Sequence, residues 1–204
     1  MKNLITIVAA LSLTFLLGDV NITSAQQIAE SGDRTFEVGV TPFSSSPVSF
    51  NQLRLRSFQS DDTAYRIRGF VNYQSERQNE DRRDSRVDIN AAPGMEWHFF
   101  NYENISLYYG AELPLSFRTS RSFRGDETWR NTNPNGFFGI GVSALAGMDL
   151  HFLQRLYTGV EVNYGLNFRT YFDQEVGDQT QDVDANQLTL GPNAYPNFRF
   201  GIRF

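Results

Sequence analysis

The chain has 204 residues, a net charge of −5 and no cysteine. This length suits one domain or two small ones. The acidic balance argues against a nucleic-acid-binding protein, which would need clustered positive charge. Without cysteine there can be no disulfide, no thiolate metal site, no cysteine nucleophile and no lipid attached to cysteine.

The N-terminal residues have the order of side chains that is typical of a secretory signal peptide. Lys2 supplies a positive charge, Leu4–Leu17 is an apolar run, and Thr23-Ser24-Ala25 provides the small residues of a cleavage site. The apolar run is shorter than the roughly 20 residues that a transmembrane helix needs. We therefore expect cleavage after Ala25. The expected parts of the chain are a signal peptide at residues 1–25, a short periplasmic segment at residues 26–33 and a folded domain at residues 34–204.

Beyond this start, apolar and polar side chains alternate along eight segments. In one of them, Val87 and Ile89 fall on one face, while Asp88 and Asn90 fall on the other. Successive side chains of a β-strand point to opposite faces, so each segment is predicted to be a strand with one apolar and one polar side. The predicted strands are Thr35–Phe43, Phe50–Phe58, Thr63–Gln74, Arg86–Phe99, Ile105–Arg118, Phe137–Phe152, Leu156–Tyr171 and Tyr195–Phe204.

The connections between these strands alternate in length, as they do in outer-membrane barrels. The three short ones are Gln59–Asp62, Phe100–Asn104 and Leu153–Arg155, and the long polar ones are Glu76–Ser85, Thr119–Gly136 and Phe172–Ala194. The apolar faces carry almost no charge, and aromatic residues lie near the strand ends, as at membrane interfaces. We therefore predict an all-β fold, an eight-stranded antiparallel up-and-down transmembrane β-barrel. A water-soluble β-sandwich, which also alternates, is the alternative.

The last strand carries the aromatic or apolar residues Phe198, Phe200, Ile202 and Phe204 at every second position. This pattern resembles the C-terminal signal that the barrel-assembly machinery recognises. Together with the eight strands, it makes the chain similar to the small outer-membrane barrels: the membrane domain of outer membrane protein A, outer membrane protein X, and the outer-membrane β-barrel domain group. The resemblance implies a multi-pass barrel in the bacterial outer membrane, with outer-membrane lipids and the assembly machinery as partners. It is a resemblance of architecture, which does not decide function.

The predicted inward faces carry carboxylates and arginines in similar numbers. The interior of an eight-stranded barrel is just wide enough for side chains to fill it, and an unpaired buried charge costs several kcal/mol. We therefore expect structural ion pairs that close the lumen, with a polar conduction path as the alternative. The residues expected in these pairs are Glu37, Arg54, Arg56, Arg66, Arg68, Asp88, Glu96, Glu112, Asp149, Glu161, Arg199 and Arg203.

The chain has two histidines, His98 and His151, both on predicted inward faces near short connections. An enzyme acting on outer-leaflet lipid would need its base near the long loops, and no Ser–His–acid set can be placed there by spacing. We expect the histidines to make polar contacts with Glu96 or Asp149. The sequence predicts no catalytic residue, no cofactor and no metal site.

The predicted loop after the fifth strand places arginines beside aromatic residues. Arg121, Arg124, Trp129 and Arg130 could contact the phosphates of lipopolysaccharide, because guanidinium groups bind phosphate through two parallel hydrogen bonds. A solvated loop is the alternative.

We therefore expect a non-enzymatic integral outer-membrane barrel with a structural, surface-interaction or accessory-subunit role. Whether it has an envelope protein partner stays open, and no nucleic-acid partner is expected. Two alternatives stay open. A narrow channel for small or hydrophobic solutes would be favoured by low charge inside or a lateral gap between strands. A lipid-modifying enzyme would be favoured by a serine, a histidine and an acid in contact near the outer rim.

Overall fold

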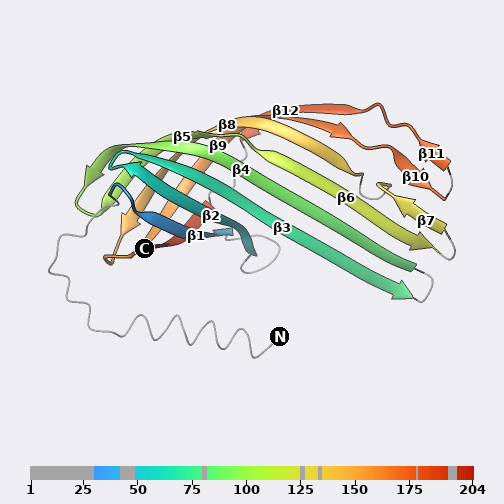
Figure 1. Cartoon of the computed structure of the whole chain (residues 1–204), viewed down its shortest axis with the longest axis horizontal. Coiled ribbons are helices and arrows are strands. Elements are labelled where there is room, and N and C mark those ends of the chain that lie inside the picture. The colour runs from blue at the N-terminus through green and yellow to red at the C-terminus, as the bar shows by residue number, and fades with distance from the viewer. Residues whose placement is uncertain are drawn as a thin grey trace.

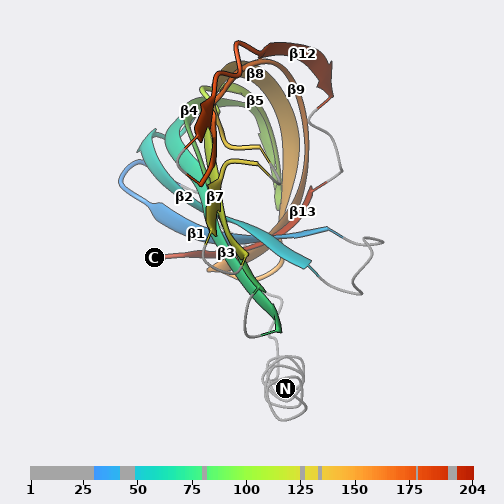
Figure 2. The same ribbon diagram turned by 90° about the vertical axis from the view of Figure 1, so that its right-hand side faces the viewer.

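The computed structural model describes residues 30–41, 49–79, 82–124, 127–132, 135–177, 179–192 and 197–204. Their strands form a single antiparallel sheet that closes on itself (Figures 1 and 2). The ring closes because β1 pairs with β2 along one edge and with β13 along the other. The expected signal peptide and its cleavage after Ala25 lie outside the described residues.

The ring has eight strand positions, and two of them are made of two strands in succession. β5 and β6 are separated at Pro114, which has no N–H to donate to a neighbouring strand. β12 and β13 both pair with β9, one after the other along its length. In order around the ring, the strands are β1 (Arg34–Thr41), β2 (Ser49–Ser60), β3 (Thr63–Asn79), β4 (Arg82–Tyr102), β5 (Ile105–Glu112) with β6 (Leu115–Arg124), β8 (Phe137–His151), β9 (Leu156–Tyr171), and β12 (Asn186–Pro192) with β13 (Asn197–Arg203). The predicted eight-stranded barrel is confirmed, and closure of the ring rules out the sandwich.

The two ends of the barrel differ. The short-turn end carries the tight connections at Asp61–Asp62, Glu103–Asn104 and Phe152–Arg155, and the C-terminus lies there too (Figure 1). At the opposite, long-loop end, β3, β4 and β6 extend well beyond the neighbouring strands. Three short strands continue the sheet there: β7 (Glu127–Arg130), β10 (Gln174–Val176) and β11 (Gln179–Gln181).

The strands at the long-loop end are longer than the sequence predicted. The interval Glu76–Ser85 was expected to be a loop, but its described residues extend β3 and β4 in antiparallel pairing, with a shift of register between Arg77 and Asn79. Likewise, β12 lies within the expected loop Phe172–Ala194. The extensions of β3 and β4 lack a regular apolar face, and backbone pairing between these two strands forms them instead.

Pairing around the wall is incomplete in the long-loop half. The pairing of β3 with β2 ends at Gly69 opposite Leu53, although β3 continues to Asn79. β12 pairs with β9 along one edge. In the part of the chain that the structure describes, no strand pairs with the other edge of β12 or with β3 beyond Gly69 on the β2 side.

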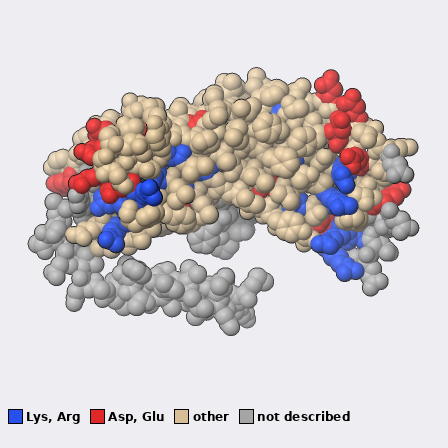
Figure 3. Space-filling view, viewed as in Figure 1, with Lys and Arg blue, Asp and Glu red and all other residues tan. Residues whose placement is uncertain are grey.

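The distribution of side chains is the reverse of that in a water-soluble protein. Figure 3 shows a middle zone almost free of charged residues, with charges gathered at both ends. Apolar residues more than half exposed on the outer wall include Leu53, Tyr65, Val71, Val142, Val162 and Leu190. The side chains of Glu37, Glu96 and Glu161, by contrast, are fully buried inside the barrel. Among the described residues, no helix has the length and apolar character to cross a membrane.

Candidate functional site: the charged lumen

A cluster of ion pairs fills the short-turn half of the barrel. We call it the lumen cluster. It has five carboxylates and five guanidinium groups, joined by contacts of 2.5 to 3.2 Å. The carboxylates are Glu37, Glu96, Glu112, Asp149 and Glu161, and the guanidinium groups are Arg54, Arg56, Arg66, Arg68 and Arg199. These charges balance, so the cluster as a whole is neutral.

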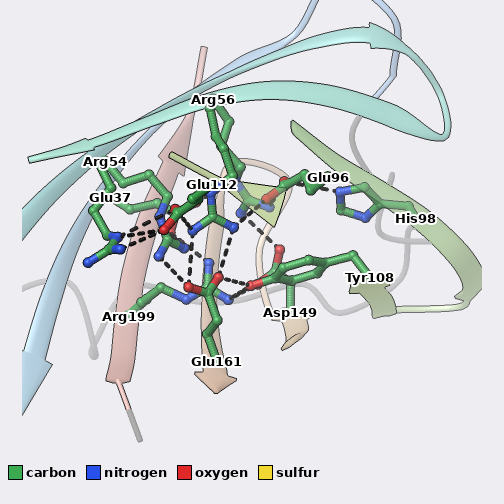
Figure 4. Close-up of polar contacts among 12 residues, drawn as sticks. Glu37, Arg54, Arg56, Glu96, His98, Tyr108, Glu112, Asp149, Glu161 and Arg199 are labelled. Atoms are coloured by element: carbon green, nitrogen blue, oxygen red, sulfur yellow. Dashed lines mark hydrogen bonds and ion pairs between the residues drawn. The ribbon is translucent and has the colours of Figure 1, made fainter. Parts of the chain in front are cut away.

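Glu37 on β1 contacts three arginines of the cluster (Figure 4). Its oxygens lie 2.5 Å from Arg56, 2.7 Å from Arg199 and 3.2 Å from Arg54. The hydroxyl of Tyr157 donates a further hydrogen bond to it at 2.8 Å. Four donors therefore hold one buried carboxylate, so its negative charge is compensated without water.

Other pairs cross the lumen between strands that are not neighbours. Glu161 on β9 contacts Arg54 on β2 at 2.8 Å and Arg66 on β3 at 2.9 Å. Asp149 on β8 contacts Arg56 on β2 at 2.8 Å. Such contacts tie opposite walls together and occupy the space between them.

These cross-lumen pairs explain an arrangement that would otherwise be unfavourable. Arg54 and Arg68 face each other directly on β2 and β3, as do Arg56 and Arg66. Like charges in direct register destabilise a sheet. Here Glu96 contacts both Arg56 and Arg66. Arg54 and Arg68 each contact a carboxylate of their own, Glu161 and Glu112. The sequence shows that these charges face inward, but it cannot show which pairs form.

Two tyrosines complete the cluster, and the sequence analysis missed both. Tyr108 donates to Glu161 at 2.8 Å, and the hydroxyl of Tyr157 accepts a hydrogen bond from Arg56 at 2.9 Å. Each tyrosine lies against a glycine of the next strand, Gly147 and Gly201 respectively, where a Cβ atom would collide with the phenol ring. A large inward side chain opposite an inward glycine is the signal that could have identified them.

Two of the residues expected in the ion pairs lie apart from the lumen cluster. Asp88 pairs with Arg118 and, at 2.9 Å, with Arg86, nearer the long-loop end. Arg203 pairs with Asp33 at 3.3 Å at the short-turn rim. The structure thus brings the other ten expected residues into one cluster and places these two in separate, more exposed pairs.

The histidines lie at the short-turn end of the cluster. His98 contacts Glu96 at 3.2 Å through Nε2 and Ser106 at 2.7 Å through Nδ1, while His151 packs against the ring of Tyr157 with centroids 5.1 Å apart. A serine, a histidine and an acid therefore do meet, but at the end opposite the long loops. Ser106 is 1% exposed, and Glu96 is already paired with arginines. A substrate has no access to this serine, so the contact is structural.

The remaining expected residues lie on or near the surface. Phe198, Phe200 and Ile202 face outward on β13, and Phe204 follows them at the rim. Arg121 and Arg130 are directly opposite each other on β6 and β7, and both are exposed. The other two residues expected to contact lipopolysaccharide lie in the same pairing of β6 with β7: Arg124 is opposite Glu127, and Trp129 is opposite Ser122.

No family model and no curated protein matches this sequence. Among solved structures, the chain is similar to Ail, the attachment invasion locus protein of Yersinia pestis, with 11% identity and a TM-score of 0.47 over 85% of this chain and 99% of Ail. It is also similar to the N-terminal β-barrel domain of OprF from Pseudomonas aeruginosa, with 11% identity and a TM-score of 0.35 over 86% of this chain and all of that domain. Because identity is low, the role of this barrel has to be derived from its own side chains.

Proposed function

We propose that this chain is an integral barrel of a bacterial-type outer membrane, closed by its lumen cluster, with a non-enzymatic structural, surface-interaction or accessory-subunit role. The observation that carries the proposal is the reversed distribution of side chains: buried charges inside and exposed apolar residues outside. In water, so large an apolar surface would drive aggregation. In a bilayer, the same surface is in its preferred solvent.

The dimensions of the wall support a membrane position. A transmembrane strand needs about 9–11 residues when tilted, and β8 and β9 have 15 and 16. On β9 the outward positions Val160, Val162, Tyr164, Leu166 and Phe168 form an uninterrupted apolar row. Such a row matches the apolar band of an outer-membrane barrel. The short-turn end would face the periplasm and the long-loop end the cell exterior.

A closed lumen restricts the role of the protein. Each charged group of the lumen cluster has an ion-pair partner, the cluster is neutral and almost all of it is buried, so little space or net charge is left to conduct ions. The serine that contacts a histidine is inaccessible, which argues against the lipid-modifying enzyme. Function would then reside in the strands and loops of the long-loop end, in the outer wall or in the periplasmic rim. The outward row ending at Phe204 would be the part recognised by the assembly machinery.

One observation favours the narrow channel for hydrophobic solutes as a second candidate. In the long-loop half of the described wall, β12 and the outer part of β3 each have an edge without a strand partner. A lateral passage there would let an apolar solute move between the bilayer and the lumen above the lumen cluster. Such a passage would end at the cluster, so this candidate accounts for entry but not for transfer across the membrane.

Membrane fractionation of a Gram-negative host that expresses the chain tests the proposal. The protein should sediment with the outer membrane, resist extraction by alkaline carbonate, and migrate faster on a gel before heating than after it. A soluble periplasmic protein, or one released by carbonate, would contradict the membrane position.

A further inference from the structure

Two arginines converge on one aromatic ring inside the long-loop half of the barrel, the end that faces the viewer in Figure 2. The guanidinium carbons of Arg118 on β6 and Arg169 on β9 lie 5.1 and 4.8 Å from the centroid of the Phe137 ring on β8. The face of an aromatic ring attracts cations. Gln187 on β12 is directly opposite Arg169. We call these four residues the vestibule site.

A glycine on β8 lets Arg169 reach this ring. Gly139 is directly opposite Arg169, and a Cβ atom at Gly139 would lie 3.2 Å from Cγ of Arg169. The same Cβ atom would collide with the hydroxyl of Ser116 on β6. The stem of Arg169 therefore passes over the glycine towards Phe137, which is directly opposite Arg118. Two guanidinium groups from strands that are not neighbours thus meet at one place on the inner wall.

The two guanidinium groups differ in their partners. Nε of Arg118 pairs with Asp88 on β4, which also contacts Arg86 at 2.9 Å. In the described ranges, no carboxylate pairs with Arg169. One aspartate is therefore shared by two arginines, and the third arginine at this place has an aromatic ring as its neighbour. This differs from the lumen cluster, where each arginine contacts a carboxylate.

Other carboxylates of the long-loop half lie farther along the strands. Glu76 and Asp84, the next inward carboxylates, are directly opposite each other, and Asp84 is four residues from Asp88, which is about 13 Å along a strand. β4 and β6 run on for six residues beyond Asp88 and Arg118, or about 20 Å. The acidic residues 80, 81 and 126 follow only after those ends in the chain, and residue 178 follows β10, which lies beyond the same level. Three segments outside the described ranges contain no aspartate or glutamate: residues 42–48, 133–134 and 193–196.

Gln187 adds neutral donors to the vestibule site. Its side-chain oxygen accepts a hydrogen bond from the hydroxyl of Tyr171 at 3.0 Å, so its amide N–H groups remain as donors beside Arg169. Gln187 is exposed and the Arg118 side chain is 32% exposed, so solvent reaches the site. Guanidinium and amide donors gathered on a solvent-accessible inner wall provide the groups that bind an oxyanion.

We infer that the vestibule site binds the phosphate group of a soluble phosphate monoester that enters from the long-loop end. Such a group carries about −1.5 to −2 charges near pH 7 and three acceptor oxygens, and a guanidinium group can bind it through two parallel hydrogen bonds. A soluble ligand fits better than a lipid headgroup because the site is on the inner wall. The outward residues beside it belong to the apolar surface: Phe117, Phe138 and Phe168. The inference rests on the proposed membrane position, which makes the long-loop end the exterior.

Isothermal titration calorimetry of the folded full-length barrel in maltoside micelles, with glucose 6-phosphate as the probe at low ionic strength, tests the inference. The wild type should bind the probe saturably, and inorganic phosphate should compete with it. Arg169→Gln should weaken binding by at least about tenfold, the contribution of one hydrogen bond to a charged group. The matched control Arg83→Gln removes an exposed arginine of β4 at the same end but on the outer face, and it should leave the affinity almost unchanged.

Two further ligands separate the possible sources of phosphate. Glucose should not bind, and phosphatidylglycerol in the micelles should not displace glucose 6-phosphate. No saturable binding, equal losses in Arg169→Gln and Arg83→Gln, or displacement by phosphatidylglycerol would overturn the inference. If Arg169→Gln does not fold, Gln187→Ala, at an exposed position, should still weaken binding by about two- to tenfold. Heat-dependent gel mobility reports folding separately: a heat-modifiable barrel that does not bind contradicts this inference alone, whereas a wild-type chain that never forms such a barrel contradicts the membrane proposal.

Discussion

Replacing Glu161 with glutamine should destabilise the barrel strongly. The carboxylate of Glu161 contacts Arg54 at 2.8 Å and Arg66 at 2.9 Å and accepts a hydrogen bond from Tyr108 at 2.8 Å. The substitution Glu161→Gln keeps the size of the side chain but leaves one excess positive charge in a buried cluster. Removing one partner of a buried ion pair costs about 3–5 kcal/mol. We expect the lower part of this range because both arginines keep another carboxylate.

Urea unfolding in lipid vesicles, followed by tryptophan fluorescence, measures the effect. With a dependence of about 1–3 kcal/mol per molar urea, a loss of 3 kcal/mol lowers the midpoint by at least about 1 M. The matched control is Glu175→Gln, which removes the carboxylate of the half-exposed pair with Arg130. Exposed pairs contribute about 0–1 kcal/mol, so this variant should unfold almost as the wild type does.

A double variant separates lost charge balance from lost packing. Adding Arg54→Gln to Glu161→Gln restores neutrality in the lumen cluster. The loss of unfolding free energy in the double variant should be smaller than the sum of the losses in the two single variants by at least about 1 kcal/mol, as expected for coupled neighbours. Additive effects, or a Glu161→Gln variant within about 1 kcal/mol of Glu175→Gln, would refute the view that the cluster acts as one buried network.

Two further pairs of variants test the outer wall and the edge of the lumen cluster. Val162 lies midway along β9 on the outer wall, and Val162→Arg should lower the free energy of unfolding in vesicles by about 2–4 kcal/mol. The control Thr180→Arg, on exposed β11, should leave it almost unchanged. Equal effects of the two substitutions in the same urea assay would argue against a bilayer around β9. Glu112→Ala should lower the free energy of unfolding by about 3–5 kcal/mol. Arg68→Ala should lower it clearly less, because the Arg68 side chain is 22% exposed and that of Glu112 is fully buried. A larger loss for Arg68→Ala than for Glu112→Ala would show that solvent reaches Glu112.

The barrel could be predicted from the sequence because alternation is a local signal. Each apolar face, such as Val160 to Phe168 on β9, is read from neighbouring residues alone, and the bilayer requires it to be continuous. The inward direction of the charges follows from the same alternation. The outer parts of β3 and β4 could not be predicted in this way because both their faces are polar beyond Tyr73, and pairing between the two strands forms them.

The pairing inside the lumen depends on contacts between distant strands. Arg54 and Glu161 are 107 residues apart in the chain, and their contact depends on how the ring closes and on which strand faces which across the lumen. The part that the tyrosines play in the cluster could not be predicted for the same reason. The inward direction of Tyr108 follows from alternation, but its contacts depend on Glu161 from another strand and on Gly147 directly opposite. The opposed arginines at the long-loop end likewise appear only when the register aligns Arg77 with Arg83 and Arg121 with Arg130.

The central claim is that the lumen cluster closes the barrel, and ion conductance through planar bilayers tests it most directly. Purified wild-type protein should insert, as shown by its heat-dependent gel mobility after recovery, and give no steady conductance above that of the bare bilayer. We expect this result because five carboxylates and five guanidinium groups lie within 3.2 Å of their partners in the lumen. Large, reproducible and steady conductance steps from the wild-type protein would contradict the closed lumen and favour the channel.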